Sequence, residues 1–369
     1  MTNYSNDPRV VMTLDAGGTN FVFSAMQGNR AIVEPFALPS RADHLATSLA
    51  NMVEGFTRVK AQLPAAPCAI SFAFPGPADY PGGIITAPPN LTAWRDVPLG
   101  PFLAARFGVP VYINNDGDLF AYGEASAGFL PYVNGLLAQA GSPKRFRNLL
   151  GVTLGTGFGG GIVSGGQLFL GDNSAGGEVW LLRHKLIAEC HAEEGASIRA
   201  VRRVYGEAAG IGAADVPEPK VIFEIAEGRA AGDVAAAREA FRRMGEVAGD
   251  AIAEAVTLLD CLVVIGGGIA GAHPRFLPAL VDAMSTTYTA PDGKRYSRLI
   301  PRVFNLEDPA QRDLFFQGET RTVTVPGTSQ TVQFDALKRT AVGISRLGTS
   351  QAAAIGAYAF ALARLDELS

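Results

Sequence analysis

The amino-acid sequence predicts an α/β protein made of two duplicated halves. In both halves an apolar strand runs through a turn of glycine and threonine into a second strand, at residues 10–26 and 149–163. Because these stretches lie about 140 residues apart in one chain, they indicate an internal duplication. A continuous apolar run at residues 261–265, followed directly by three glycines, predicts a strand that is buried on both faces of a sheet.

The length, composition and net charge of the chain allow two buried cores and disfavour several classes of protein. The chain has 369 residues, of which 48% are hydrophobic and 18% charged, with a net charge of -4 that argues against a nucleic-acid partner. No apolar run is long enough to span a membrane and no signal peptide is visible, so we expect a cytoplasmic protein. Cys68, Cys190 and Cys261 are far apart and fit reduced thiols.

The turn of the first hairpin predicts a phosphate cradle. Gly17 and Gly18 let backbone N–H groups approach an anion, and Thr19 and Asn20 add side-chain donors. Asp15, at the end of the strand, would hold Mg²⁺ through water. An ordinary Gly-Gly hairpin is the alternative for this stretch taken alone.

The next segments alternate between helix, strand and loop. Apolar residues at helical spacing predict a helix over residues 44–63, and His44 at its start is interpreted as a surface or capping residue. A buried strand at 69–74 then runs into Gly76 in a rigid Pro-Gly-Pro turn, where α/β sheets often bind small ligands. The long loop at 79–98 is interpreted as packed and functional.

A strand at residues 109–113 delivers Asn115 and Asp116 to the start of a helix. A carboxylate at the end of a strand is well positioned to accept a proton from a substrate hydroxyl, which makes Asp116 the candidate base. The alternative is that an aspartate here only caps the helix, and Asp118 is the better placed cap.

The second glycine and threonine turn predicts a second phosphate clamp, formed by Gly155, Thr156, Gly157 and Gly159. A long alanine-rich helix is expected over 233–259. The strand that follows it ends at Gly266, Gly267 and Gly268, where flat backbone before a further helix is a plausible seat for adenine or ribose.

Two carboxylates of the second half are candidates for a sugar pocket. Glu178 and Glu194 would accept hydrogen bonds from vicinal hydroxyls, and the alternative for each is a solvated loop carboxylate. His184, Cys190 and His191 lie near them, but their spacing matches no standard zinc pattern.

The segment at 286–346 is the least expected part of the chain. Its proline, charge and turn content predict an excursion that contains a β-hairpin at 322–325 and 331–334. We assign it no chemical role. An alanine-rich helix over 349–365 is expected to return and pack on an earlier domain.

The order of these motifs along the chain resembles that of the ROK family of bacterial sugar kinases and repressors. This family belongs to the sugar kinase, heat-shock protein 70 and actin superfamily. The resemblance covers nearly the whole chain. It rests on residues 15–20 and 154–161 as phosphate motifs, 264–268 as the adenosine motif, 74–79 and 90–94 as sugar-side loops, and 115–116 as the catalytic Asn-Asp pair.

The resemblance implies a fold of two duplicated actin-like (ribonuclease H-like) ATPase domains, with mixed sheets flanked by helices and a cleft between them. We expect a small domain at 1–118 plus about 350–369, and a large domain at 119–349. A homodimer is also expected.

The resemblance further implies ATP-dependent phosphorylation of a hexose hydroxyl, with Mg²⁺ and with the 6-position favoured. Asp116 would be the general base, and the sugar would be fixed by Gly76, Asn90, Asn115, Glu178 and Glu194. Glucose, mannose, fructose and N-acetylhexosamines all remain open. The alternatives are a catalytically silent sugar-binding regulator of the same fold and a kinase of another branch of the superfamily.

Two departures from the family pattern bear on the substrate. Glu178 is followed by Val179 and Trp180, where members commonly have Ile-Gly-His, so the histidine that touches sugar and zinc is missing. The cysteine-rich zinc motif is reduced to Cys190, so no structural zinc is expected. The first phosphate turn comes too early in this sequence for a preceding helix-turn-helix, which disfavours a repressor.

Overall fold

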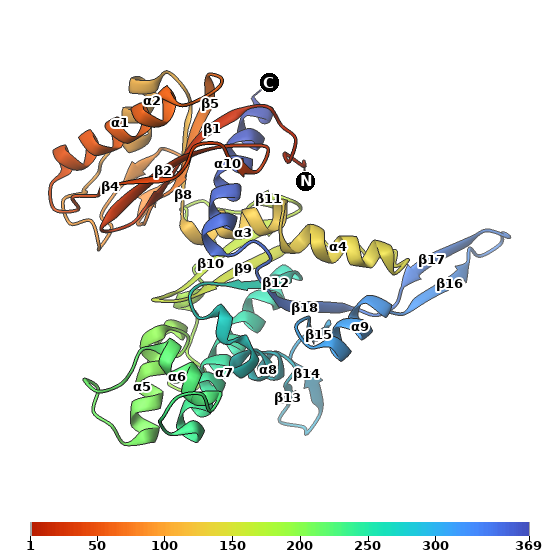
Figure 1. The fold of residues 1–369 in the computed structure, drawn as a ribbon. Helices are drawn as coiled ribbons and strands as arrows, with labels where there is room; N and C mark the ends of the chain where they lie inside the picture. Colours follow the sequence, from red (N-terminus) through yellow and green to blue (C-terminus); the bar gives the residue numbers. More distant parts are fainter. Residues whose placement is uncertain (1, 369) are drawn as a thin grey trace. The chain divides into compact units, whose positions relative to one another are not determined.

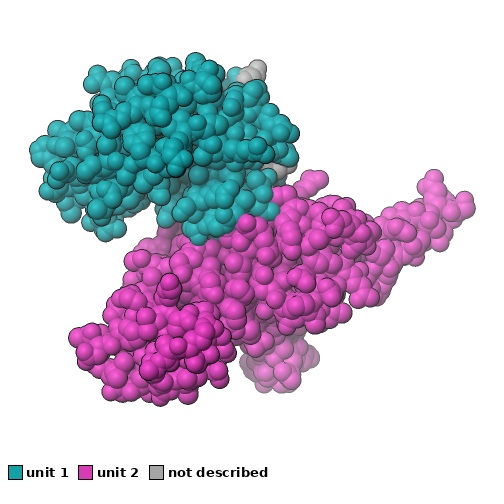
Figure 2. All heavy atoms as spheres, in the orientation of Figure 1, with its two compact units in different colours: residues 1–128, 161–177, 347–369 teal, residues 129–160, 178–346 magenta. Residues whose placement is uncertain are grey.

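The protein is described by a computed structural model that covers residues 2–368. Its contacts divide the chain into two compact units, which Figure 2 shows in different colours. Unit 1 comprises Met1–Gly128, Gly161–Gly177 and Leu347–Ser369, and unit 2 comprises Phe129–Gly160 and Glu178–Arg346. Residues 119–128 and 161–177, which the sequence-based division assigns to the large domain, therefore lie in unit 1.

The sheet of unit 1 has the order β3-β2-β1-β5-β8, with β4 paired to β2 (Figure 1). The strands are β1 (Val10–Ala16), β2 (Asn20–Gln27), β3 (Arg30–Ala31), β4 (Phe36–Pro39), β5 (Pro67–Ala73) and β8 (Val111–Asn114). The expected first hairpin is confirmed, because β1 and β2 pair antiparallel. Since β1, β5 and β8 run parallel, their carboxyl ends meet at one edge, where Asp15 pairs with Ala73 and Ala73 with Asn114.

Helices cover this sheet and close its core. They are α1 (Leu45–Ala61), α2 (Leu99–Phe107), α3 (Asp116–Ser126) and α10 (Thr349–Glu367), and short strands β6 (Ala78–Asp79) and β7 (Ile84–Ile85) form a separate pair. The capping interpretation of His44 is confirmed, since its ring accepts a hydrogen bond from the Thr47 N–H. Trp94 is fully buried against Phe74, with ring centroids 4.9 Å apart, so the 79–98 loop packs on the core.

Helices α3 and α10 pack with almost no space between their backbones. A Cβ added at Gly123 would lie 1.9 Å from the Ala352 carbonyl oxygen, and one added at Gly356 would lie 1.9 Å from that of Leu119. Only glycine permits this approach. The contact explains why α3, which begins with Asp116, is part of unit 1 together with the C-terminal helix.

The second sheet has the order β11-β10-β9-β12-β18-β15. Its strands are β9 (Leu149–Leu154), β10 (Phe158–Ser164), β11 (Gln167–Leu168), β12 (Leu262–Gly266), β15 (Arg302–Asn305) and β18 (Arg339–Ile344). The helices of unit 2 are α4 (Phe129–Gln139), α5 (Ile198–Ala209), α6 (Pro219–Ala226), α7 (Val234–Leu259), α8 (His273–Met284) and α9 (Pro309–Gln317), with single turns η1 (Val179–Leu181), η2 (Ala192–Glu194) and η3 (Ala270–Ala272). The predicted long helix is thus α7, which Asp233 caps by accepting from the Ala236 N–H.

The extent predicted for the excursion at 286–346 is wrong. This segment supplies β15 and β18, and β18 lies between β12 and β15 inside the sheet. Two hairpins remain outside the sheet, β13 (Thr287–Thr289) with β14 (Arg295–Ser297) and β16 (Thr320–Thr324) with β17 (Thr331–Asp335). The second hairpin pairs Val323 with Val332, as expected, and it projects from the rest of unit 2 (Figure 1).

Candidate active site

The first glycine turn is held in shape by backbone hydrogen bonds. The Gly17 N–H donates to the Asn20 carbonyl (3.0 Å), and Ser40 donates from its N–H to the Thr19 carbonyl (2.9 Å) and from its hydroxyl to the Gly18 carbonyl (2.5 Å). Gly18, Thr19 and Asn20 are exposed. The turn is therefore ordered without using the side chains that the sequence assigns to phosphate.

The carboxyl group of Asp15 lies beside this turn and within reach of the charge of Asp116. The Asp15 pKa is raised above its ordinary value, first because neighbouring groups displace water and second because of the negative charge of Asp116. Mg²⁺ in proteins is commonly bound through one or two carboxylates and several waters, so Asp15 with Asp116 nearby fits the metal. The raised pKa indicates a site where a cation would relieve repulsion.

The start of α3 differs from the expectation in one respect. Asn115 is its N-cap, because the Asn115 Oδ1 accepts from the Gly117 N–H at 2.8 Å. Asp118, predicted to be the cap, lies buried inside the first turn. That capping prediction is wrong because the helix begins at Asp116, which makes Asn115 the residue before its first turn. Asp116 is exposed at the first helical position, and its Oδ1 accepts from the same N–H at 2.8 Å.

The structure brings the sugar-side residues of unit 1 together. A Cβ on Gly18 would lie 3.9 Å from the Asn90 Cβ, so Asn90 is beside the first glycine turn. The Tyr80 hydroxyl donates to the Phe74 carbonyl at 3.0 Å, accepts from the Asn115 amide at 3.5 Å and would lie 3.0 Å from a Cβ on Gly76. Tyr80 was not among the site residues expected from the sequence. Its position as an aromatic residue in the long 79–98 loop was the one feature that could have indicated it.

The second glycine turn is closed in the same way within unit 2. The Gly155 N–H donates to the Gly157 carbonyl (3.0 Å), and the Ile198 N–H donates to the Gly155 carbonyl (2.8 Å). Thr156 is exposed at the tip. The Glu193 carboxylate accepts from the Phe158 N–H at 3.0 Å. A Cβ on Gly159 would lie 2.6 Å from the Thr153 hydroxyl.

Glu193, and not Glu194, reaches this turn. A Cβ on Gly157 would lie 2.7 Å from the Glu193 Oε2, while Arg199 holds the other oxygen at 2.7 Å. Glu194 pairs with Arg199 nearer the surface, and this hydrogen bond lowers the Glu194 pKa. The sequence analysis named Glu194 and missed its neighbour, and no local pattern separates the two.

Glu178 belongs to the same part of unit 2. Its carboxylate accepts a hydrogen bond from the Trp180 indole N–H, and the Trp180 ring meets His191 edge to face with centroids 5.1 Å apart. His191 approaches Glu194 at 4.0 Å. Trp180 and His191 thereby connect the two segments that carry the candidate sugar carboxylates.

The glycines after β12 lie against the second glycine turn. Gly267 has a φ of +92°, and a Cβ there would lie 2.2 Å from the Leu154 carbonyl oxygen. A Cβ on Gly155 would lie 3.8 Å from the Gly268 nitrogen. Gly266 is the buried last residue of β12. The predicted phosphate and adenosine segments of unit 2 are therefore neighbours in space.

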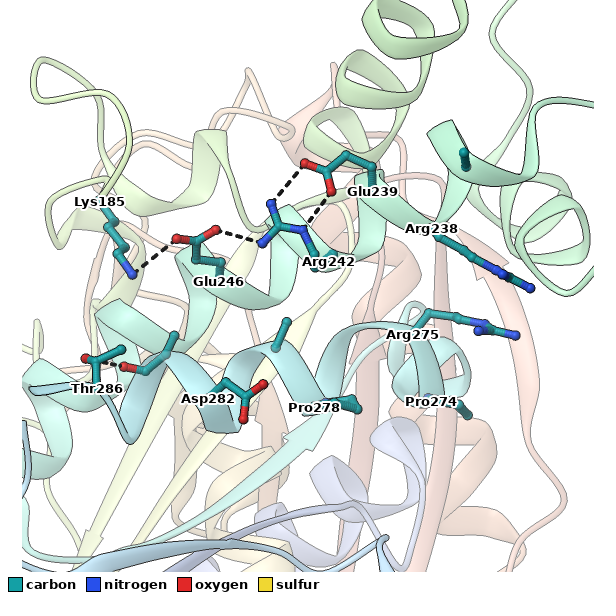
Figure 3. Close-up of a pocket in the computed structure, with 13 residues that line it drawn as sticks. Lys185, Arg238, Glu239, Arg242, Glu246, Pro274, Arg275, Pro278, Asp282 and Thr286 are labelled. Carbon is teal, nitrogen blue, oxygen red and sulfur yellow. Dashed lines mark hydrogen bonds and ion pairs between the residues drawn. The ribbon is translucent and has the colours of Figure 1, made fainter.

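A polar groove elsewhere in unit 2 does not contain any of these residues. Figure 3 shows it between α7 and α8, with Arg242 held by Glu239 and Glu246, and Lys185 held by Glu246 at 3.2 Å. Its volume is about 620 Å³. Because these charges satisfy one another, we do not assign a charged ligand to the groove. Within residues 2–368, no helix has the length and apolar character needed to span a membrane.

Comparison with known proteins gives a consistent result over most of the chain. A family model described as ROK family matches residues 11–310. A glucokinase of Streptomyces coelicolor is 27% identical over 278 residues, which cover 69% of this chain and 81% of that protein. An N-acetyl-D-glucosamine kinase of Vibrio vulnificus is 28% identical over 273 residues, 69% of this chain and 82% of that one.

Solved structures agree. A glucokinase from Parabacteroides distasonis, known from a crystal structure, is 53% identical in sequence to this chain. The two structures align with a TM-score of 0.91 over 98% of this chain and 99% of that chain. A ROK hexokinase from Thermus thermophilus has a TM-score of 0.68 at 22% identity, over 97% of this chain and 99% of that chain, and this likeness concerns the fold alone. The expected actin-like α/β fold is confirmed by these neighbours.

Proposed function

This chain belongs to the ROK family and is a sugar kinase, and from that premise we propose that it transfers a phosphoryl group from ATP to the 6-hydroxyl of a hexose, with Asp116 as the general base. The observation that carries the proposal is the pair of carboxyl groups beside an ordered glycine turn, in which the charge of Asp116 reaches Asp15. Such a pair supplies a proton acceptor next to a site for phosphate and its metal.

In the proposed reaction, unit 1 performs the proton transfer. Asp116 is exposed at the start of α3 and accepts the proton of the attacking hydroxyl, which makes the oxygen a better nucleophile. Gly18, Thr19 and Asn20 offer hydrogen-bond donors to the phosphate oxygens, while the Gly17 N–H holds the turn in shape. Mg²⁺, when bound beside Asp15, would neutralise charge on the transferred group.

The sugar is held by groups that orient its hydroxyl toward Asp116. Asn90 lies beside the first glycine turn, and the Tyr80 hydroxyl lies next to both Asn115 and the Gly76 backbone. Orientation of this kind accounts for a large part of the acceleration in phosphoryl transfer. In unit 2, Glu178 and Glu194 stay candidate acceptors for sugar hydroxyls, and we add Glu193.

The nucleotide would use the glycine segments of unit 2. Gly155, Thr156, Gly157 and Gly159 would meet the phosphates, and the run from Gly266 to Gly268 would meet the adenosine. The close approach of Gly267 to Leu154 supports this assignment, because it keeps the two segments together. Glucose is the favoured hexose, since the 53% identical neighbour is described as a glucokinase.

The test is a coupled assay of ADP release from Mg-ATP with a panel of glucose, mannose, fructose and N-acetylglucosamine. We expect at least one sugar to stimulate turnover, and Asp116→Asn to lower kcat by at least about a hundredfold, as expected for loss of a general base. Asp43→Asn, at an exposed position outside the site, is the matched control.

Sugar binding without any ATP turnover would contradict the proposal and favour the silent regulator. Near-normal kcat in Asp116→Asn would remove Asp116 from the role of base while leaving the kinase assignment in place. Identification of the phosphorylated carbon in the product tests the 6-position. The expected homodimer and the cytoplasmic location stay predictions.

A further inference from the structure

Unit 1 contains a pocket that shares Tyr80 with the sugar-side residues and holds none of the other groups assigned to the reaction. It has a volume of about 520 Å³, and Tyr80, Tyr112, Asn114, Phe169, Phe360 and Arg364 are among the residues that line it. Pockets that bind small molecules commonly have volumes of about 300–1,000 Å³. The pocket runs along the edge strand β8, all four residues of which line it, and beside α10, whose Phe360 ring meets that of Tyr112 edge to face with centroids 6.1 Å apart.

The polar group of this pocket is the side chain of Asn114. Asn114 is 1% exposed, and neither its amide nitrogen nor its amide oxygen has a hydrogen-bond partner in the part of the chain that the structure describes. Its neighbour Ile113 packs into the core on the opposite face of the strand. A buried amide without partners costs about 1–3 kcal/mol, and a ligand that reaches it from the pocket would relieve this cost.

The other lining groups restrict the chemistry of that ligand. Tyr112, Phe169 and Phe360 present apolar ring surface. Arg364 is already paired with Glu367 at 2.6 Å, and Asp172 adds a second carboxylate, so the rim carries more negative than positive charge. An anion is disfavoured there, whereas hydroxyl groups are good donors to carboxylates.

We propose that this pocket binds a neutral monosaccharide, separately from the hexose that is phosphorylated. A pyranose has an apolar face for the aromatic rings and adjacent hydroxyls that both donate to and accept from one amide. Asn114 is followed directly by Asn115 and Asp116, and Tyr80 lines the pocket while it also bonds the Phe74 carbonyl. A sugar in the pocket therefore contacts the strand that positions the general base, which makes it an effector of turnover.

The experiment is isothermal titration of the full chain with glucose, and in parallel with mannose and N-acetylglucosamine, without nucleotide. We expect two sites per chain for at least one sugar, and one site in Asn114→Leu. Phe169→Ala, at a half-exposed position, should weaken the second site about three- to tenfold while leaving the first unchanged. Gln62→Leu, an exposed residue after α1, is the control and should keep both sites.

Thermal unfolding without sugar gives an independent readout. Since Asn114 has no partner to lose, Asn114→Leu should unfold at the same temperature as the unaltered protein or higher. A lower unfolding temperature would show that water or protein satisfies the amide and would overturn the proposal. One sugar site in the unaltered protein that persists in Asn114→Leu would overturn it too, as would binding of glucose 6-phosphate or inorganic phosphate in place of the neutral sugars. A second site that remains in a chain without kinase activity would support this inference even if the proposed reaction failed.

Discussion

Burial raises the pKa of Asp15, and the negative charge of Asp116 raises it further, although the two residues are 101 positions apart in the sequence. Their strands and the helix of Asp116 bring them to one edge of the unit 1 sheet. A fold that needed only stability would separate like charges, because the charge of Asp116 makes Asp15 costlier to ionise. The cost is consistent with a site that receives a cation.

Asp15→Asn should therefore stabilise the protein in the absence of metal. With a raised pKa, the protonated carboxyl contributes stability that is present below the ordinary aspartate value of 3.8 and is lost as the pH rises through the raised pKa. We expect the variant to have a higher Tm at pH 7 and no advantage near pH 3. Thermal unfolding at a series of pH values checks this.

Mg²⁺ should raise the Tm of the unaltered protein but not that of Asp15→Asn. Asp43→Asn, which is exposed and outside the site, should behave like the unaltered protein in both tests. A fall in Tm for Asp15→Asn at neutral pH would contradict the account of repulsion.

Gly267 and Gly268 offer a matched pair for the nucleotide site. Gly267→Ala would place a Cβ 2.2 Å from the Leu154 carbonyl oxygen at a residue with a positive φ. We expect a loss of about 3 kcal/mol or more in unfolding free energy. Gly268→Ala places its methyl in open space and should keep full stability. If the adenosine assignment holds, Gly268→Ala will still raise the KM for ATP. Equal Tm values for the two variants would show that the close approach to Leu154 is relaxed.

Substitutions at Glu193 and Glu194 should have different effects, because Glu193 bonds the second glycine turn and Glu194 lies nearer the surface. Glu193→Gln weakens hydrogen bonds to the Phe158 N–H and to Arg199, each assisted by charge, so kcat/KM should fall about ten- to a hundredfold. Glu194→Gln removes a partly exposed ion pair and should change kcat/KM by about threefold or less. Steady-state kinetics with both substrates varied measures this. A larger effect at Glu194 would return it to the sugar pocket predicted from the sequence.

Arg339 and Asp335 form an ion pair whose side chains are 0% and 2% exposed, at 2.5 Å. Arg339→Met leaves a buried carboxylate without this partner, and we expect a loss of about 3–5 kcal/mol in a urea titration. Burial raises the Asp335 pKa, but hydrogen bonds from Arg339 and two backbone N–H groups outweigh it and hold the pKa below its ordinary value.

The pH dependence of this pair has a definite sign. A lowered carboxyl pKa contributes stability above the ordinary aspartate value, and that stability is lost as the pH falls through the lowered value. Acidification should therefore destabilise the unaltered protein more than Arg339→Met. A urea titration with no difference between the two would show that the guanidinium contributes nothing net.

The elements with a clear periodicity were predictable from sequence. Both glycine hairpins, the long helix α7 and the apolar β12 are where the residue pattern indicated. Their apolar spacing and turn residues are local, so no knowledge of tertiary contacts was needed. The site residues at the edge of the unit 1 sheet were found in the same way, and their roles stay predictions.

The errors share a cause, which is dependence on contacts distant in sequence. β18 begins with Arg339, a charged residue of the kind that led to the prediction of an excursion. Arg339 is buried because it pairs with Asp335, and no pattern within the strand indicates this pairing. Glu193 is distinguished from Glu194 only by its bond to Phe158. Asn115 and Asp118 are both good capping residues, and the position where α3 starts decides between them.

The crossing of α3 and α10 has a consequence for synthesis. Ribosomes make α10 after every residue of unit 2, yet it fills the space against which the helix of Asp116 closes. Until translation has passed through all of unit 2, the surface of α3 that packs on α10 lacks this partner. The close packing of α3 on α10 can therefore form only after the ribosome has made the C-terminal helix.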